Sequence, residues 1–340
     1  MKQLARNFLC AALALAAFLA AAALIHAWLP PAIPKGVAAK LEFFTQHKDE
    51  FDTVIIGTSR LYYSISPELF DRTTREEGIS TRTFNFGIDA MHPPENFYVL
   101  EQILKTKPRN LKWVVLEMGD IQTKWDAILG TQRAVYWHDW PRTVSTLKKA
   151  LNPRGGAPWY IRASRLWLAR RDLASNLTLF GKQFANAGRA ADFFPDAARE
   201  RMSEAASELG PHGDGYRLAG DPMTPERAAI FQKKLAQEVA EPRQKILDPA
   251  TESAYRQAAA KIRQIGATPL FVVTPVTSQI AVRFAQTPPP APLLSFNDFK
   301  KYPELYDTKV RIDDGHLTNE GAREFTRLLA HEFARHARQP

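Results

Sequence analysis

The chain of 340 residues is 45% hydrophobic, which provides enough apolar surface to bury the core of one large domain. This composition excludes a largely disordered chain, and the presence of one cysteine, Cys10, excludes an internal disulfide framework. The 45 Lys and Arg outnumber the 36 Asp and Glu, and the resulting net charge of +9 favours anionic partners.

An apolar stretch near the N-terminus, residues 8–28, contains no Asp, Glu, Lys or Arg and follows Lys2 and Arg6. About 20 such residues can cross a bilayer as a helix, and the basic flank predicts a cytoplasmic tip at residues 1–7. We therefore expect a retained single-pass anchor in the inner (cytoplasmic) membrane, with the body on the extracytoplasmic, periplasmic side. A cleaved signal peptide is the alternative, and it would export the body as well.

The rest of the chain is predicted to divide into a tether and one domain. Three prolines break any helix at the start of the tether, residues 29–50, and a helix is expected over 35–47. The domain is expected to occupy residues 51–340.

The domain opens with a stretch that reads as a buried strand. Residues 54–57 are an apolar, β-branched run closed by Gly57, and Thr58, Ser59 and Arg60 follow. Groups at the carboxyl ends of central parallel strands face the ligand crevice of an open sheet. Ser59 is therefore the candidate nucleophile, although most serines in such a position only cap the next helix.

Strands and helices then alternate, with one interruption, as in an α/β fold with a parallel sheet. The predicted elements are helices over 67–77, 93–105 and 252–265 and strands over 81–86, 111–117 and 268–274. No glycine-rich dinucleotide motif, phosphate loop or metal-ligand spacing is present, so no cofactor and no metal is expected.

The interruption, at about 121–248, is predicted to be a helical insertion. Its first half is basic, with ten Lys or Arg against two Asp between residues 133 and 182. Apolar residues recur at helical spacing from Leu166 to Phe180, which predicts a helix with an apolar stripe and a basic face. A basic face of this kind is suited to bind an anionic glycan or the membrane surface, whereas nucleic acid is not expected as a partner of an exported chain. The arginines predicted to bind substrate are Arg162, Arg165, Arg170 and Arg171.

The end of the chain carries the residues that a nucleophilic serine needs. Asp313 and His316 lie in one loop, just before a helix predicted to be capped by Thr318. A serine requires a base to take its proton, and the base requires an orienting carboxylate. One other pair, Asp89 and His92, has the same spacing, so the spacing alone is not specific.

Three blocks together resemble the SGNH (GDSL-like) hydrolases. They are Gly57 to Arg60, Phe84 to Gly87, and Asp313 to His316. The Gly-x-Ser-Arg form behind a membrane segment is most similar to the DltD-like, polysaccharide O-acyltransferase-associated branch. The resemblance implies a three-layer α/β/α, flavodoxin-like sheet and a catalytic triad of Ser59, His316 and Asp313.

The resemblance also implies an oxyanion hole made by the backbone amides of Ser59 and Gly87. Arg60 and Asn85, from the first two blocks, are predicted to contact the substrate. The chain departs from the family at the end of its third strand, where Glu117 stands instead of an asparagine donor. A carboxylate there would repel a developing oxyanion.

The expected activity is serine-dependent transfer or hydrolysis of acyl esters on a cell-surface polysaccharide or another acyl acceptor. A membrane-bound acyltransferase is a possible partner. The main alternative is a non-catalytic SGNH-like scaffold in a polysaccharide assembly or acyltransferase complex. A membrane-surface lipase, with a cleft lined by the tryptophans of the insertion, is a third interpretation.

Overall fold

The computed structural model describes residues 2–28, 33–124, 132–152, 158–185 and 207–338. Parts of the predicted tether (29–32) and of the predicted insertion (125–131, 153–157 and 186–206) lie outside the described residues. The helices are α1 (Lys2–Trp28), α2 (Lys35–His47), α3 (Ser59–Tyr62), α4 (Pro67–Glu76), α5 (Glu95–Lys105), α6 (Gln132–Val135), α7 (Trp140–Leu151), α8 (Trp159–Leu168), α9 (Arg170–Phe184), α11 (Pro225–Ala240), α12 (Pro249–Gln264) and α13 (Asn319–Ala337). The strands are β1 (Thr53–Gly57), β2 (Thr83–Gly87), β3 (Trp113–Glu117), β4 (Arg243–Ile246), β5 (Thr268–Val273), β6 (Ile280–Arg283) and β7 (Leu293–Ser295), and the 3₁₀ helices are η2 (Pro303–Tyr306) and η3 (Thr308–Val310).

A five-stranded sheet with the order β2-β1-β3-β5-β7 forms the centre of the domain, and its strand pairs are parallel. Counted along the chain within this sheet, the order is 2-1-3-4-5, one of the common doubly wound arrangements. The register pairs Gly57 with Gly87, so β1 and β2 end at the same level. The predicted α/β class with a parallel sheet is confirmed.

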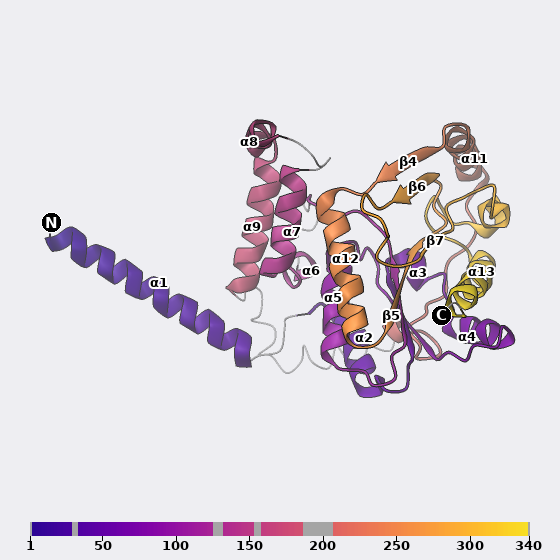
Figure 1. Cartoon of the computed structure of the whole chain (residues 1–340), viewed down its shortest axis with the longest axis horizontal. Helices are drawn as coiled ribbons and strands as arrows, with labels where there is room; N and C mark the ends of the chain where they lie inside the picture. The colour runs from indigo at the N-terminus through magenta and orange to yellow at the C-terminus, as the bar shows by residue number, and fades with distance from the viewer. Residues whose placement is uncertain (1, 29–32, 125–131, 153–157, 186–206, 339–340) are drawn as a thin grey trace.

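Alternate residues of the strands enter two separate cores. Ile56 packs in the core that contains Phe44 of α2 and Tyr255 of α12, and Ile55 packs in the core that contains Phe333 of α13. Helices α2, α5 and α12 therefore cover one face of the sheet, and α4 and α13 cover the other (Figure 1). Burial on both faces explains why the central strands are apolar runs without alternation.

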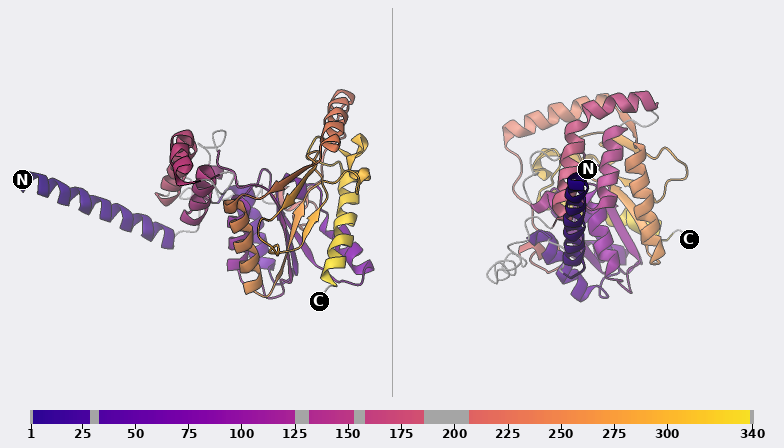
Figure 2. Two further views of the ribbon diagram at one scale, coloured as in Figure 1. Left: turned by 45° about the horizontal axis from the view of Figure 1, so that its top comes forward. Right: turned by 90° about the vertical axis from the view of Figure 1, so that its left-hand side faces the viewer.

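The described first part of the predicted insertion forms a group of helices, α6 to α9, which stands between the sheet and α1, whereas α11, from its second part, lies on the opposite side of the domain (Figures 1 and 2). Helices α7 and α9 pack together, and α7 contacts α12. The single amphipathic helix predicted across this region is wrong, because the chain breaks at Ala169 into α8 and α9. Leu166 and Leu177, placed on the predicted stripe, are exposed, and Leu179 is the leucine that enters the core.

The sequence did not predict three of the strands. β4 lies inside the predicted helical insertion and pairs in parallel with β6 in a separate two-stranded sheet. β7 is three residues long and completes the main sheet beside β5, just after the proline-rich stretch at 287–292. The exposed, polar β4 and the very short β7 carry no clear hydrophobic period.

Helix α1 leads away from the domain (Figure 1) and is long and apolar enough to cross a membrane. Nearly all of it is exposed to solvent in the protein alone. The expected anchor is therefore supported by the length and composition of this helix.

Candidate active site

Ser59 stands where β1 ends and the short helix α3 begins, at the carboxyl edge of the sheet. Thr58 caps α3 by accepting a hydrogen bond from the Arg60 amide, at 3.2 Å. Gly57 is required at the bend, since a Cβ there would lie 2.6 Å from both Glu117 Oε2 and Leu61 Cδ1. The strand and the tight turn together fix the position of the Ser59 side chain.

The structure brings Ser59, His316 and Asp313 together. Ser59 Oγ lies 2.8 Å from His316 Nε2, across 257 positions of sequence. On the other side of the imidazole ring, Nδ1 lies 2.9 Å from both carboxylate oxygens of Asp313. With Nδ1 protonated, Nε2 can accept the hydroxyl proton of Ser59.

Asp313 is held in its ionised form although burial raises its pKa. Hydrogen bonds from the His316 side chain and from the Gly315 and His316 amides outweigh the burial and lower the pKa to about 2. The two amides donate to Oδ1 at 2.7 and 2.8 Å. The carboxylate is therefore charged across the physiological range and can orient the imidazole.

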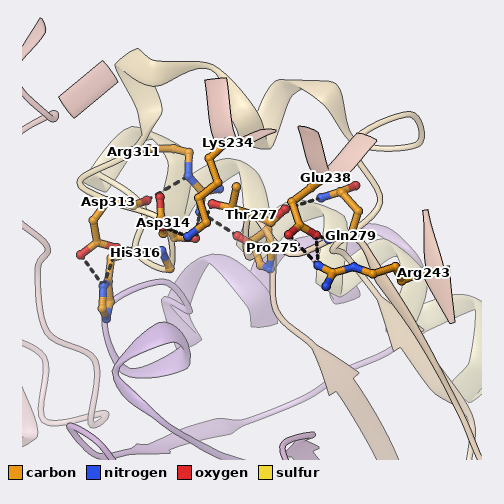
Figure 3. A network of polar contacts seen from close by, with 11 residues as sticks. Lys234, Glu238, Arg243, Pro275, Thr277, Gln279, Arg311, Asp313, Asp314 and His316 are labelled. Atoms are coloured by element: carbon orange, nitrogen blue, oxygen red, sulfur yellow. Dashed lines mark hydrogen bonds and ion pairs between the residues drawn. The ribbon is translucent and has the colours of Figure 1, made fainter. Parts of the chain in front are cut away.

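A buried arginine, Arg311, holds the loop that carries Asp313 and His316 (Figure 3). Its guanidinium donates to four main-chain carbonyls, those of Leu305 (2.8 Å), Pro275 (2.9 Å), Asp314 (2.9 Å) and Asp313 (3.2 Å). Burial lowers the pKa of Arg311 to about 10. This loop is thus tied to the segment after β5 and is not an unsupported surface turn.

Two further contacts hold the same loop from outside. Thr277 donates from its amide and its hydroxyl to the Asp314 carbonyl, each at 3.0 Å. Lys234 of α11 forms an ion pair with the Asp314 carboxylate (Figure 3). No sequence pattern predicted these contacts. Thr277 and Lys234 lie 37 and 80 positions from Asp314, so their contacts depend on how distant segments meet.

Glu117, which replaces the asparagine expected by resemblance, is buried at the end of β3. Its Oε2 accepts the Thr58 amide at 2.6 Å, and its Oε1 accepts the Thr274 hydroxyl at 3.3 Å. Arg60 Nη1 lies 3.6 Å from Oε1, so the carboxylate faces a cation. Glu117 therefore supports the turn that carries the candidate nucleophile.

Asn85 and Gly87, expected to contact the substrate and the oxyanion, lie beneath α3 and have hydrogen-bond partners within the protein. The Gly87 amide donates to Asn85 Oδ1 at 2.8 Å, so it has a partner already. Asn85 Nδ2 donates to the Leu61 and Ile65 carbonyls at 2.9 and 2.8 Å. A Cβ on Gly87 would lie 2.5 Å from the Tyr62 amide nitrogen, which explains the glycine by close packing of the chain.

A buried lysine of α2, Lys40, also holds the end of β2 in place. Lys40 Nζ donates to the carbonyls of Asn85 (3.2 Å), Gly87 (2.7 Å) and Gly215 (2.7 Å). Burial lowers its pKa to about 7 against the opposing effects of nearby carboxylates, of which Glu208 is the largest. The backbone amide of Asn85 donates to the Asp214 carbonyl at 2.9 Å, so the glycine-rich segment near 215 covers the edge of β2.

Polar side chains surround Ser59 and His316, and they include Arg60, Tyr63, Asp89 and His92. Arg60 is about one-third exposed and its Nε passes close to Gly315. Tyr63 donates to Asp89 Oδ2 at 2.8 Å, and its ring lies 6.4 Å from that of His316. Burial, with smaller effects from Arg60 and Arg133, lowers the pKa of His92.

The predicted substrate arginines of the insertion lie elsewhere. Helices α8 and α9 stand on the far side of α5 and α12 from α3 (Figure 1). Arg170 and Arg171 are exposed on α9, Arg165 is half-buried on α8, and the side chain of Arg162 lies outside the described residues. The exposed tryptophans of α8 likewise line no cleft at Ser59.

No protein-family model matches the chain. No curated protein matches it either. Function is therefore inferred from the geometry around Ser59. Among the described residues, no group of three or more His, Cys, Asp or Glu side chains is placed to hold a metal ion.

Proposed function

We propose that the chain is a serine-dependent acyl-ester transferase or esterase, with Ser59 as nucleophile, His316 as base and Asp313 as the group that orients His316. The observation that carries the proposal is the continuous path from Ser59 Oγ through His316 to the Asp313 carboxylate, with contacts of 2.8 and 2.9 Å. The block order that resembles SGNH hydrolases supports the same assignment.

The chemistry follows from the arrangement of these three side chains. Ser59 Oγ attacks the ester carbonyl while its proton passes to His316 Nε2, and the imidazolium is stabilised by Asp313. His316 then gives the proton to the departing alkoxide, leaving an acyl-enzyme on Ser59. Water or a sugar hydroxyl, deprotonated by His316, attacks that ester and releases Ser59. Water makes the reaction hydrolysis, and a sugar hydroxyl makes it O-acyl transfer.

The donors for the oxyanion differ from those expected by resemblance. The Ser59 amide has no hydrogen-bond partner among the described residues and can serve. The Gly87 amide is engaged by Asn85. Arg60 is the cation nearest the turn by sequence and is partly exposed, so we assign its guanidinium as the second group that stabilises the oxyanion.

The proposed setting is a membrane. In this proposal α1 anchors the protein in the inner membrane with the body on the periplasmic side, because Lys2 and Arg6 precede the apolar stretch. The proposed acceptor is a cell-surface polysaccharide, and a membrane-bound acyltransferase is the proposed source of acyl groups.

The proposal is tested by turnover of p-nitrophenyl acetate by the full chain in detergent. We expect turnover that falls to the uncatalysed rate in Ser59→Ala and in His316→Ala. Added polysaccharide should divert the acyl group from water if the enzyme is a transferase. Turnover that is equal in the wild type and in Ser59→Ala would refute the assignment.

A second candidate, a non-catalytic scaffold in a polysaccharide assembly or acyltransferase complex, is favoured by one observation. The Gly87 amide is occupied and a carboxylate, Glu117, stands beside the turn, so the expected oxyanion hole is incomplete. For a scaffold, Ser59→Ala would leave acylation of the polysaccharide in cells unchanged, while loss of the whole chain would abolish it.

A further inference from the structure

Helix α8 presents an exposed apolar surface, which we name the α8 surface. Its five members are between 51% and 76% exposed. They are Trp159, Tyr160, Leu166, Trp167 and Leu168. Contiguous exposed apolar side chains of this size usually mark a surface that binds a partner or a membrane.

Exposed apolar side chains cover more than half of the circumference of α8. At about 100° per residue, the five side chains spread over about 200° of the helix. The half-buried positions, Ile161 and Arg165, lie in the remaining arc. A helix that packs on a soluble domain turns its apolar side inward, so α8 presents this side to something outside the domain.

The composition of the α8 surface fits a bilayer interface. Trp and Tyr concentrate at the boundary between lipid headgroups and acyl chains, because their rings are apolar and carry one polar group. Arg170, at the start of α9, stacks over the Trp167 ring at 4.0 Å, and Arg171 beside it is exposed. Cationic side chains next to apolar ones match anionic lipid headgroups.

The position of α8 also fits a bilayer. Helices α8 and α9 lie on the side of the domain from which α1 departs (Figures 1 and 2). The rings of Phe18 in α1 and Phe184, at the end of α9 remote from α8, lie 6.5 Å apart, so α9 adjoins the helix that is apolar enough to cross a membrane. Charge complementarity and this continuity with α1 both point to lipid.

We propose that the α8 surface lies in the interface of the membrane that α1 crosses, as a second contact with anionic lipid. The inference rests on the proposed membrane anchoring and is independent of the chemistry at Ser59. Two attachments restrict rotation of the domain about the tether.

The test uses the full chain in phosphatidylcholine vesicles with or without 30% phosphatidylglycerol. Cys10 is the only cysteine, so a nitroxide on the native Cys10 reports whether α1 is in lipid. In the Cys10→Ala background, a nitroxide at Trp167→Cys reports the α8 surface. The matched control is Ile230→Cys, an exposed apolar position on α11, away from α1. Collision with oxygen reports lipid, and collision with a water-soluble nickel chelate reports water.

We expect the label at 167 to collide often with oxygen and rarely with nickel, while the label at 230 shows the opposite pattern. Replacement of Arg170 and Arg171 by Gln should reduce the difference in vesicles that contain phosphatidylglycerol. Equal nickel collision at 167 and 230 would overturn the proposal. Low collision with both reagents at 167 would also overturn it, because it would mean that protein, such as a second copy of the chain, covers α8. A Cys10 label in water would refute the anchoring and this proposal together, without bearing on turnover at Ser59.

Discussion

Replacement of Arg311 by Met should weaken both the fold and the candidate site. Arg311 is fully buried, and its four bonds to carbonyls, at about 1.5 kcal/mol each for a charged donor, contribute about 6 kcal/mol. Removal of the buried charge offsets part of this loss. A pKa lowered from 12.5 to about 10 corresponds to about 3.5 kcal/mol, at about 1.4 kcal/mol per pH unit. The free energy of unfolding should therefore fall by about 2.5 kcal/mol.

The assay is urea unfolding of the full chain in detergent, followed by the rate at which a fluorophosphonate labels Ser59. Arg311→Met should lower both, because the loop carrying His316 loses its anchor. The matched control is Lys234→Met, which removes an exposed ion pair with Asp314 in the same loop and should change stability by less than about 1 kcal/mol. If Arg311→Met lowered the free energy of unfolding no more than Lys234→Met does, and left the rate of Ser59 labelling unaltered, the anchoring role of Arg311 would be refuted.

Three further substitutions test the support beneath Ser59. Glu117→Gln keeps an acceptor for the Thr58 amide, so a fluorophosphonate should label Ser59 faster in this variant than in Glu117→Ala. Glu117→Ala leaves the buried amide without its acceptor and should lose about 1–3 kcal/mol of stability. Equal labelling rates would argue against a supporting role of Glu117. Gly87→Ala should destabilise the fold by about 2 kcal/mol through contact with the chain above it, whereas Gly181→Ala, in open space within α9, should stabilise it by about 0.5–1 kcal/mol; thermal melting separates the two. Between pH 7 and 10.5 the folded protein binds fewer protons at Lys40 than the unfolded chain, so the free energy of unfolding should rise with pH by up to about 1.4 kcal/mol per unit relative to Lys40→Met. Urea unfolding of both proteins at pH 7 and 9 measures this difference, and an equal change with pH in the two proteins would contradict it.

The fold was largely predictable where apolar period and capping residues agree. β1, β3 and β5 are apolar runs buried on both faces, and Ser66 and Thr318 cap α4 and α13 as helix-start patterns predict. The strands β4, β6 and β7 were not predicted. Their sequences are short or polar, and their pairing depends on segments that are distant in the chain.

The site was predictable in outline only. Ser59 follows a strand, and His316 precedes an anchored helix, so both were expected at one edge of the sheet, where the structure brings them within 2.8 Å. The expected roles of Asn85 and Gly87 rested on resemblance. The structure instead pairs the two residues with each other, a contact set by a side-chain rotamer that no spacing reveals. The same limit applies to the contact of Arg311 with the Pro275 carbonyl, 36 positions away in the chain.

The most direct test of the central claim is the site of covalent labelling by a fluorophosphonate, read by peptide mass spectrometry on the full chain. We expect a phosphonyl adduct on Ser59 that is abolished in His316→Ala and strongly slowed in Asp313→Asn. An unlabelled Ser59 in protein that remains folded, or labelling that is insensitive to His316, would contradict it.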